Sequence, residues 1–266
     1  MAAPILSVIM GVYNCPTEEM LVRSVKSVLE QSFSDFEFII CDDGSDNGTW
    51  QWLMKLAAAD SRIVLLKNDK NIGLAVTLNR CIKAARGEFI ARQDADDYSL
   101  PARFEKQTDY LRSHEKYALV GSDCYLYEDK TFGSRKMPHH PKKKDFLFNS
   151  PYIHGSVMFR KEVFSHGLYR SCGHEGKYED YDLFMRLCGD GINGANINEP
   201  LYAYYTPEEP KPVSAAMRFD EAAVRFGGFR EMGMLPSGLI YVFKPLALAV
   251  LPHGLFRKMK RQWGRI

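Results

Sequence analysis

Three carboxylates lie within four positions of the segment GEFIARQDADDYSLP, residues 87–101: Asp94, Asp96 and Asp97. Like charges this close raise one another's pKa, so the cluster predicts a positively charged partner. A divalent cation fits the residue types, because carboxylate and phosphate oxygens are the usual ligands of Mg²⁺ or Mn²⁺. The alternatives are water or a basic side chain such as Arg92, which would otherwise be a surface arginine.

Polar clusters also follow three other short apolar segments of the chain. Each apolar segment predicts a strand, and in open α/β sheets ligands bind outside the carboxyl ends of the strands. Four polar clusters at one edge of a sheet therefore indicate one binding site. The other three clusters are Tyr13 with Asn14, the run Asp42-Asp43-Gly44-Ser45, and Asn71 with Gly73.

The elements that must position these residues alternate along the chain. Short apolar runs predict strands, and the segments between them carry apolar residues at helical spacing. This alternation predicts an α/β fold with a mainly parallel sheet and helices on both faces. The predicted strands are 5–10, 36–41, 62–67 and 88–92, and the predicted helices are 21–29, 50–57, 74–85 and one opened by Pro101.

The motifs of several other sites are missing. No G-x-G-x-x-G follows the first predicted strand and no G-x-x-x-x-G-K-[ST] occurs, which argues against dinucleotide and P-loop chemistry. The acidic loop lacks the glycine and the terminal Glu of an EF-hand. The six cysteines are scattered without a C-x-x-C pair, so they predict no zinc site and indicate a reducing compartment. We expect no nucleic-acid partner.

Four segments together resemble the family 2 glycosyltransferases, the inverting enzymes of the GT-A fold, across about residues 4–205. They are PILSVIMGVYN, IICDDGSDNGT, NIGLAVTLNRCIKAARGEFIARQDADD and YEDYDLFMRL. The similarity is greatest to bacterial enzymes that build lipopolysaccharide O-antigen or exopolysaccharide repeat units. It implies a Rossmann-like GT-A catalytic domain over residues 1–205 and a helical, basic C-terminal appendage over residues 206–266.

The resemblance also implies roles on the donor side. Asp43 would accept the N3–H of uracil, which cytosine lacks, while Val12 and Tyr13 would flank the base and the ribose. Asp96 would lie near ribose and metal, and Asp97 would bind a Mn²⁺ or Mg²⁺ ion directly. Taken alone, Asp43 fits a helix-capping turn equally well, and Tyr13 fits simple packing. The other residues expected to bind the nucleotide sugar are Asn71, Gly73, Arg92 and Asp94.

On the acceptor side the resemblance implies a general base at the Asp of the Glu-Asp pair in YEDYD, which is Asp180. It would take the proton from an acceptor hydroxyl as that oxygen attacks the anomeric carbon, opposite the departing UDP. Glu179 would orient the loop or the acceptor, and His154 would contact the acceptor or the diphosphate. The alternatives are acidic residues that only favour a helix start, and a structural histidine.

These roles predict transfer of a hexose or N-acetylhexosamine from a UDP-sugar, with inversion, to a saccharide carried on a polyprenyl diphosphate. Two alternatives stay open. A nucleotidyltransferase would share the acidic core, but GVYNCPTEE is not the glycine-rich basic loop that it needs after the first strand. A sugar-nucleotide-binding protein without transferase activity would keep Asp43 and the D-x-D but would not need Asp180.

The C-terminal segment is basic. After Glu231 there is no acidic residue, and six basic residues contribute +6 in a chain of net charge +2. Together with the apolar residues between Leu239 and Phe256, this predicts docking on an anionic membrane surface, with Pro245 and Pro252 preventing one continuous helix. The alternative is packing on the catalytic domain or on a second subunit. Because the N-terminus lacks a signal-peptide pattern, we expect a cytoplasmic protein at the inner face of the membrane.

Overall fold

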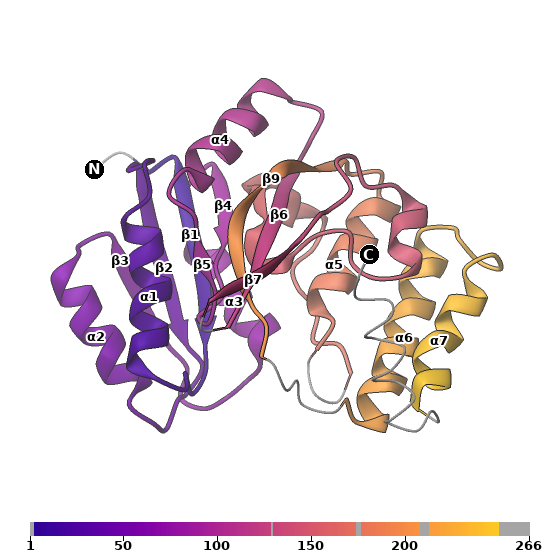
Figure 1. Cartoon of the computed structure of the whole chain (residues 1–266), viewed down its shortest axis with the longest axis horizontal. Helices are drawn as coiled ribbons and strands as arrows, with labels where there is room; N and C mark the ends of the chain where they lie inside the picture. Colours follow the sequence, from indigo (N-terminus) through magenta and orange to yellow (C-terminus); the bar gives the residue numbers. More distant parts are fainter. Residues whose placement is uncertain (1–2, 129, 174–176, 208–212, 250–266) are drawn as a thin grey trace.

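The computed structural model describes residues 3–128, 130–173, 177–207 and 213–249, which Figure 1 shows in chain order. The basic cluster between Arg257 and Arg265 lies outside the described residues, and so does Pro252. Within the described part, the α/β architecture and the C-terminal helices predicted from the sequence are both confirmed.

The first half of the chain alternates strand and helix as the apolar pattern predicts. β1 and β2 are buried along their whole length, which is why they read as unbroken apolar runs. The elements are β1 (Leu6–Val12), α1 (Glu18–Leu29), β2 (Phe36–Asp42), α2 (Thr49–Ala59), β3 (Ile63–Lys67), α3 (Leu74–Ala84) and β4 (Phe89–Arg92).

The second half of the chain is more irregular. Its first helix begins at Arg103, with Ala102 rather than Pro101 at its boundary. The elements are β5 (Tyr98–Ser99), α4 (Arg103–Ser113), β6 (Leu119–Tyr127), β7 (Thr131–Arg135), β8 (Met158–Arg160), α5 (Glu179–Gly189), β9 (Gly194–Tyr205) and the short 3-10 helices η1 (Lys143–Leu147), η2 (His154–Ser156) and η3 (Lys161–His166).

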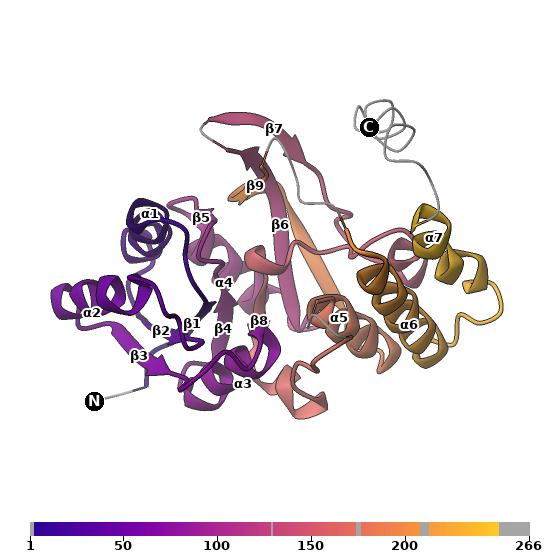
Figure 2. The same cartoon turned by 90° about the horizontal axis from the view of Figure 1, so that it is seen from below.

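The strands form one sheet in the order β3-β2-β1-β4-β8-β6-β9-β5, and β7 pairs with β6. β3, β2, β1 and β4 run parallel, whereas β8 is antiparallel to both β4 and β6. Helices lie on both sides of the sheet in Figures 1 and 2. The parallel register pairs Val12 with Asp42, so the carboxyl ends of β1 and β2 meet at one edge.

Two separate cores cover the two faces of the parallel strands. Ile9 and Ile39 belong to the core that also contains α3 and α5, while Val8 and Phe38 belong to the core that contains α1, α2 and α4. β1, β2 and β4 are therefore buried on both faces, whereas β3 and β7 are partly exposed.

Two helices form the C-terminal part: α6 (Ala215–Glu231) and α7 (Leu239–Ala249). They lie side by side in both views, and α6 packs on α5. Phe229 of α6 and Val242 of α7 are buried in the core that contains α5. The helical C-terminal part thus shares a core with the sheet, and the domain boundary between residues 205 and 206 stays a prediction.

Helix α7 continues through Pro245, so the prediction that this proline interrupts the helix is wrong. A proline in a helix lacks the N–H that would bond to the carbonyl four residues earlier, here that of Tyr241. Pro245 is buried, and its packing offsets the lost hydrogen bond. Among the described residues, no helix has the length and apolar character needed to cross a bilayer.

Candidate active site

Asp43 follows β2 and holds the turn that precedes α3. Its Oδ1 accepts hydrogen bonds from Asn68 Nδ2 at 2.6 Å and from the Ile72 N–H at 3.0 Å, and its Oδ2 accepts one from the Gly73 N–H at 2.9 Å. Gly73 has φ +92, a value that favours glycine. The structure therefore brings Asp43 together with the Asn71–Gly73 turn, and it leaves Oδ2 with capacity for one more donor.

The loop after β1 lies against the loop after β2. The Asn14 N–H donates to Ser45 Oγ at 2.9 Å, and the Asn14 side chain donates to Asp46 Oδ1 at 2.9 Å. Val12 is buried at the strand end, whereas Tyr13 is 47% exposed. An exposed tyrosine ring beside the Asp43 turn is placed to cover a planar ligand such as a nucleobase.

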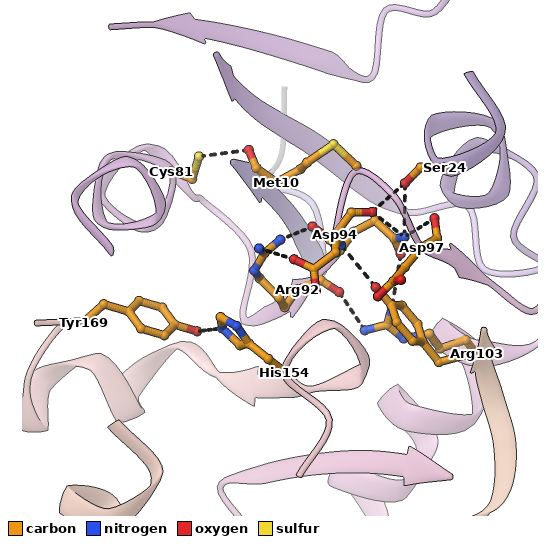
Figure 3. A network of polar contacts seen from close by, with 11 residues as sticks. Met10, Ser24, Cys81, Arg92, Asp94, Asp97, Arg103, His154 and Tyr169 are labelled. Carbon is orange, nitrogen blue, oxygen red and sulfur yellow. Dashed lines mark hydrogen bonds and ion pairs between the residues drawn. The ribbon is translucent and has the colours of Figure 1, made fainter. Parts of the chain in front are cut away.

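Arg92, at the end of β4, is the positive partner of the acidic loop. It is 1% exposed, so it is not a surface arginine, and its guanidinium forms an ion pair with Asp94 and donates to the Gln93 carbonyl. Burial, the largest effect, lowers the pKa of Arg92, but Asp94 together with Tyr169, Tyr202 and Glu179 outweighs burial and leaves that pKa raised. Figure 3 shows the guanidinium between Asp94 and His154.

Asp97 is buried whereas Asp96 is exposed, so the two carboxylates that the sequence predicts as metal ligands differ in accessibility, and both assignments stay predictions. Asp97 is 1% exposed, and its Oδ1 accepts a hydrogen bond from the Tyr205 N–H of β9 at 2.7 Å. Burial, followed by repulsion from Asp94 and Asp96, raises the pKa of Asp97 well above its usual value. The Asp97 N–H donates to the Asp94 carbonyl at 3.3 Å, and Asp97 Oδ2 is buried without a hydrogen-bond partner among the described residues.

Asp96 is the exposed member of the cluster. The surrounding chain desolvates its carboxyl and Asp94 repels its charge, which together raise the pKa of Asp96 to about 6. A bound cation would relieve this repulsion. No group of three or more metal-ligating side chains converges among the described residues. Mg²⁺ at nucleotide sites is held by one or two carboxylates plus phosphate oxygens, and Asp94 with Asp96 fits that donor set.

The first turn of α5 carries the Glu-Asp pair. The residue before it, Tyr178, has φ 73 and makes no side-chain cap, so the pair enters the helix at its first two positions. Glu179 is buried and Asp180 is half-buried. Burial and the neighbouring Asp180 raise the pKa of Glu179 to about 7. Asp180 is thus the more accessible of the two carboxylates.

His154 lies in η2, next to the start of β8. Its Nε2 lies 2.9 Å from the Tyr169 hydroxyl, as Figure 3 shows. Burial and the charge of Arg92 lower the pKa of His154, while Asp180 raises it. Arg92 also acts on the pKa of Glu179. The acidic loop and the start of α5 therefore face each other across Arg92.

Three residues of the site had no signal in the sequence. Arg103 is fully buried and donates to the Arg92 carbonyl at 2.8 Å, and its own pKa is lowered to about 10 by burial. The Tyr202 hydroxyl accepts a hydrogen bond from the Asp94 N–H at 3.1 Å. At Gly155 a Cβ would come within 2.6 Å of Asp94 Oδ2. The Tyr202 and Gly155 contacts join distant parts of the chain, whereas Arg103 lies 11 positions after Arg92.

The family model for glycosyl transferase family 2 matches residues 7–168. The chain belongs to this family and is a glycosyltransferase. One relative named as a glycosyltransferase is EpsE of Bacillus subtilis (strain 168), which is 35% identical over 265 residues. The match covers 98% of this chain and 95% of EpsE.

Two Escherichia coli relatives carry more specific names. The O-antigen biosynthesis glycosyltransferase WbnJ is 30% identical over 227 residues, covering 82% of this chain and 86% of WbnJ. WfaP, named as a UDP-Glc:alpha-D-GlcNAc-diphosphoundecaprenol beta-1,3-glucosyltransferase, is 34% identical over 125 residues, covering 47% of this chain and 48% of WfaP.

Solved structures show the same GT-A fold. S. aureus TarS 1–349 in complex with UDP-GlcNAc has a TM-score of 0.70 at 17% identity, covering 90% of this chain and 72% of that one. The mannosyltransferase PcManGT from Pyrobaculum calidifontis, in complex with GDP-Man and Mn²⁺, has a TM-score of 0.61 at 18% identity, covering 100% of this chain and 81% of that one. The fold and family predicted from the sequence are confirmed.

Proposed function

We propose that this glycosyltransferase moves a hexose or N-acetylhexosamine from a UDP-sugar to a saccharide acceptor, with inversion, in bacterial surface polysaccharide biosynthesis. One arrangement carries the proposal: the Asp43 turn and the acidic loop follow parallel strands at one edge of the sheet, and Arg92 pairs with Asp94 and acts on the pKa of Glu179 in α5. The names of WbnJ and WfaP support the pathway class, and UDP-GlcNAc in TarS supports the donor class.

Donor recognition would rest on Asp43 and Tyr13. Oδ2 of Asp43 has room for one more hydrogen bond, and the uracil N3–H is a donor of the right kind. The exposed Tyr13 ring would cover the base. Because three protein donors already fix the Asp43 carboxylate, binding would need little reordering of this side chain.

The diphosphate would be held at the acidic loop. We assign Asp96 as the residue that binds Mn²⁺ or Mg²⁺, with Asp94 beside it fixed by Arg92 and with Asp97 buried beneath. When bound, the ion would neutralise charge that develops on the leaving diphosphate. The Mn²⁺ in the PcManGT structure supports a divalent ion in this fold.

Asp180 would act as the general base. It is more accessible than Glu179, so it is the carboxylate that reaches an acceptor hydroxyl. As the acceptor oxygen bonds to the anomeric carbon, its proton passes to Asp180 and the bond to the UDP oxygen breaks on the opposite face. One such displacement inverts the anomeric centre. His154 and Glu179 would position the acceptor.

The acceptor would be a saccharide on a polyprenyl diphosphate, and the enzyme would work at the cytoplasmic face of the membrane. The name of WfaP supports a lipid-linked acceptor. Lys244, the exposed side chains of α7 and the basic sequence that follows support attachment to anionic lipid.

The test is UDP release from a panel of UDP-sugars by the purified protein, with a lipid-linked saccharide present. We expect release with one or few donors, and loss of release in excess chelator. A protein that binds a UDP-sugar but never transfers it would contradict the proposal. Full turnover in chelator would contradict the metal assignment.

A further inference from the structure

A groove lies along the segment that links β7 to η2. It has a volume of about 550 Å³, a size typical of ligand sites. Met137, Leu147 and Phe148 give it an apolar wall, and Lys136 and Lys144 line it as well. Both lysines are exposed, and neither forms an ion pair within the part of the chain that the structure describes.

Asp145 also lines the groove, and among the described residues it forms no ion pair with Lys136 or Lys144. Asp145 Oδ2 accepts a hydrogen bond from the Lys142 N–H at 2.7 Å, as part of the capping box at the start of η1. The groove thus combines an apolar wall with two available positive charges. This combination suits an amphipathic anion, and Asn149 and Ser150 add hydrogen-bonding groups to the lining.

One end of the groove meets helix α7. The Phe148 ring lies 5.1 Å from the Tyr241 ring, and Lys244 Nζ donates to the Phe148 carbonyl at 3.1 Å. The neighbouring stripe of α7 is apolar and open to solvent, with Ile240 75% exposed and Phe243 55% exposed. An apolar path therefore leads from Phe148 onto the outer face of α7.

Two residues that line the groove are linked to the catalytic site through packing and chain position. Met137 packs in the cluster that contains Tyr202, whose hydroxyl accepts the Asp94 N–H. Pro151, which also lines the groove, is three residues before His154. A molecule lying in the groove would have one end near the acceptor side of the site and the other near α7.

We propose that this groove binds the isoprenoid diphosphate that carries the acceptor saccharide, an inference that rests on the proposed lipid-linked acceptor. Lys136 and Lys144 hold the diphosphate by charge-assisted hydrogen bonds. The isoprenoid chain lies along Phe148 and leaves over Ile240 and Phe243. The saccharide at the other end of the diphosphate then faces His154 and Asp180.

Binding can be tested without any transferase activity. Calorimetry with farnesyl diphosphate as the probe should show binding, while inorganic pyrophosphate and farnesol each bind at least about tenfold more weakly. Lys136→Glu with Lys144→Glu should weaken farnesyl diphosphate binding at least about tenfold, because both charge-assisted contacts are lost. Phe148→Ser should weaken it without changing the affinity for pyrophosphate.

The matched control carries the same charge change on α1 and α3, as Lys26→Glu with Lys83→Glu, and should bind like the wild type. A wild type that does not bind farnesyl diphosphate would refute the proposal, and so would a control that loses as much affinity as the groove variant. Equal affinity for pyrophosphate and farnesyl diphosphate would show an anion site only. If the Glu variant unfolds, Lys136→Gln with Lys144→Gln repeats the test.

Transfer kinetics add a second readout. The groove variant should raise KM for a saccharide on a polyprenyl diphosphate by at least about tenfold, with kcat and transfer to a lipid-free saccharide unchanged. A loss that is equal for both acceptors would refute the proposal. A wild type that transfers nothing would instead refute the proposed function, while the calorimetry would still decide the groove.

Discussion

Arg92 and Asp94 form an ion pair in which the arginine is 1% exposed and the carboxylate side chain is 23% exposed. The pair thus links the interior of the sheet to the surface of the site. Asp94 is held in one place before any ligand arrives, and the arginine charge also reaches His154 and Glu179. The protein itself therefore supplies the positive partner that the acidic loop predicts. A bound cation would be a second positive charge at this loop.

Arg92→Gln should destabilise the protein, because it leaves Asp94 without its positive partner. The shorter side chain also leaves a cavity beneath the acidic loop. Breaking a buried pair typically costs about 3–5 kcal/mol, and partial exposure of Asp94 places this pair near about 3 kcal/mol. Urea unfolding measures the change. Arg92→Lys keeps the charge and should lose less; a Gln variant as stable as the wild type would show that the pair contributes nothing.

Asp96→Asn and Asp97→Asn should differ sharply. The first removes the proposed metal ligand, so UDP release should fall by at least about a hundredfold. The second replaces a buried carboxyl whose raised pKa favours its neutral form, and an amide oxygen can still accept the Tyr205 N–H. Divalent-ion titrations of activity separate the two. An equal loss of activity in the two variants would indicate that Asp97 also binds the metal ion.

Asp180→Asn should lower transfer by about a hundredfold or more while UDP-sugar binding survives, since only the base is lost. Initial rates and donor affinity by calorimetry measure the two effects. Glu179→Gln is the matched comparison and should lose much less activity. The reverse order of losses would make Glu179 the base, a role that its pKa of about 7 would also suit.

Glu179 should make the protein less stable as the pH rises. Its pKa is raised from 4.5 to about 7, so the folded state holds the proton more tightly than the unfolded state. This contribution to the free energy of unfolding is on the order of 3 kcal/mol. It is fully present below pH about 4.5 and is lost by pH about 7. Glu179→Gln should flatten this part of the curve of unfolding free energy against pH. An unchanged curve would contradict the burial effect.

Removal of residues 250–266 should abolish salt-sensitive binding to anionic liposomes, because five basic residues between Arg257 and Arg265 are lost, each contributing about 1 kcal/mol near anionic lipid. The cut belongs after Ala249, since a cut after Pro236 would also remove Val242 from the core. Sedimentation at low and high salt is the measurement. Full-length protein that ignores the liposomes would refute membrane docking.

Local pattern was enough to predict the parallel half of the fold. Its strands are buried on both faces, so each is an apolar run that ends at a polar turn, and Asp43 could be placed at such an end. The burial of Asp97 could not be predicted from local pattern. Its inward direction depends on Tyr205, which lies 108 positions away in the sequence. Tyr202 could not be predicted for the same reason, because the Asp94 N–H to which it bonds also lies 108 positions away.

The behaviour of Pro245 shows a second limit. Proline lowers the propensity for helix, but tertiary packing decides whether the helix survives. Val242 and Pro245 are both buried in α7, so the helix is kept in spite of its missing hydrogen bond. The sequence shows that a proline lowers the stability of the helix. It does not show the tertiary contacts that offset this loss.

The antiparallel contact between β4 and β8 divides the sheet into two parts with separate work. Asp43 and the acidic loop follow parallel strands on one side, while His154, Asp180 and the groove belong to the segments on the other. On the roles proposed above, exchange of the second part would suit the enzyme to a new sugar chain while the first part would keep the same activated donor. A chimera joined between β4 and β8 would offer an engineer the same freedom.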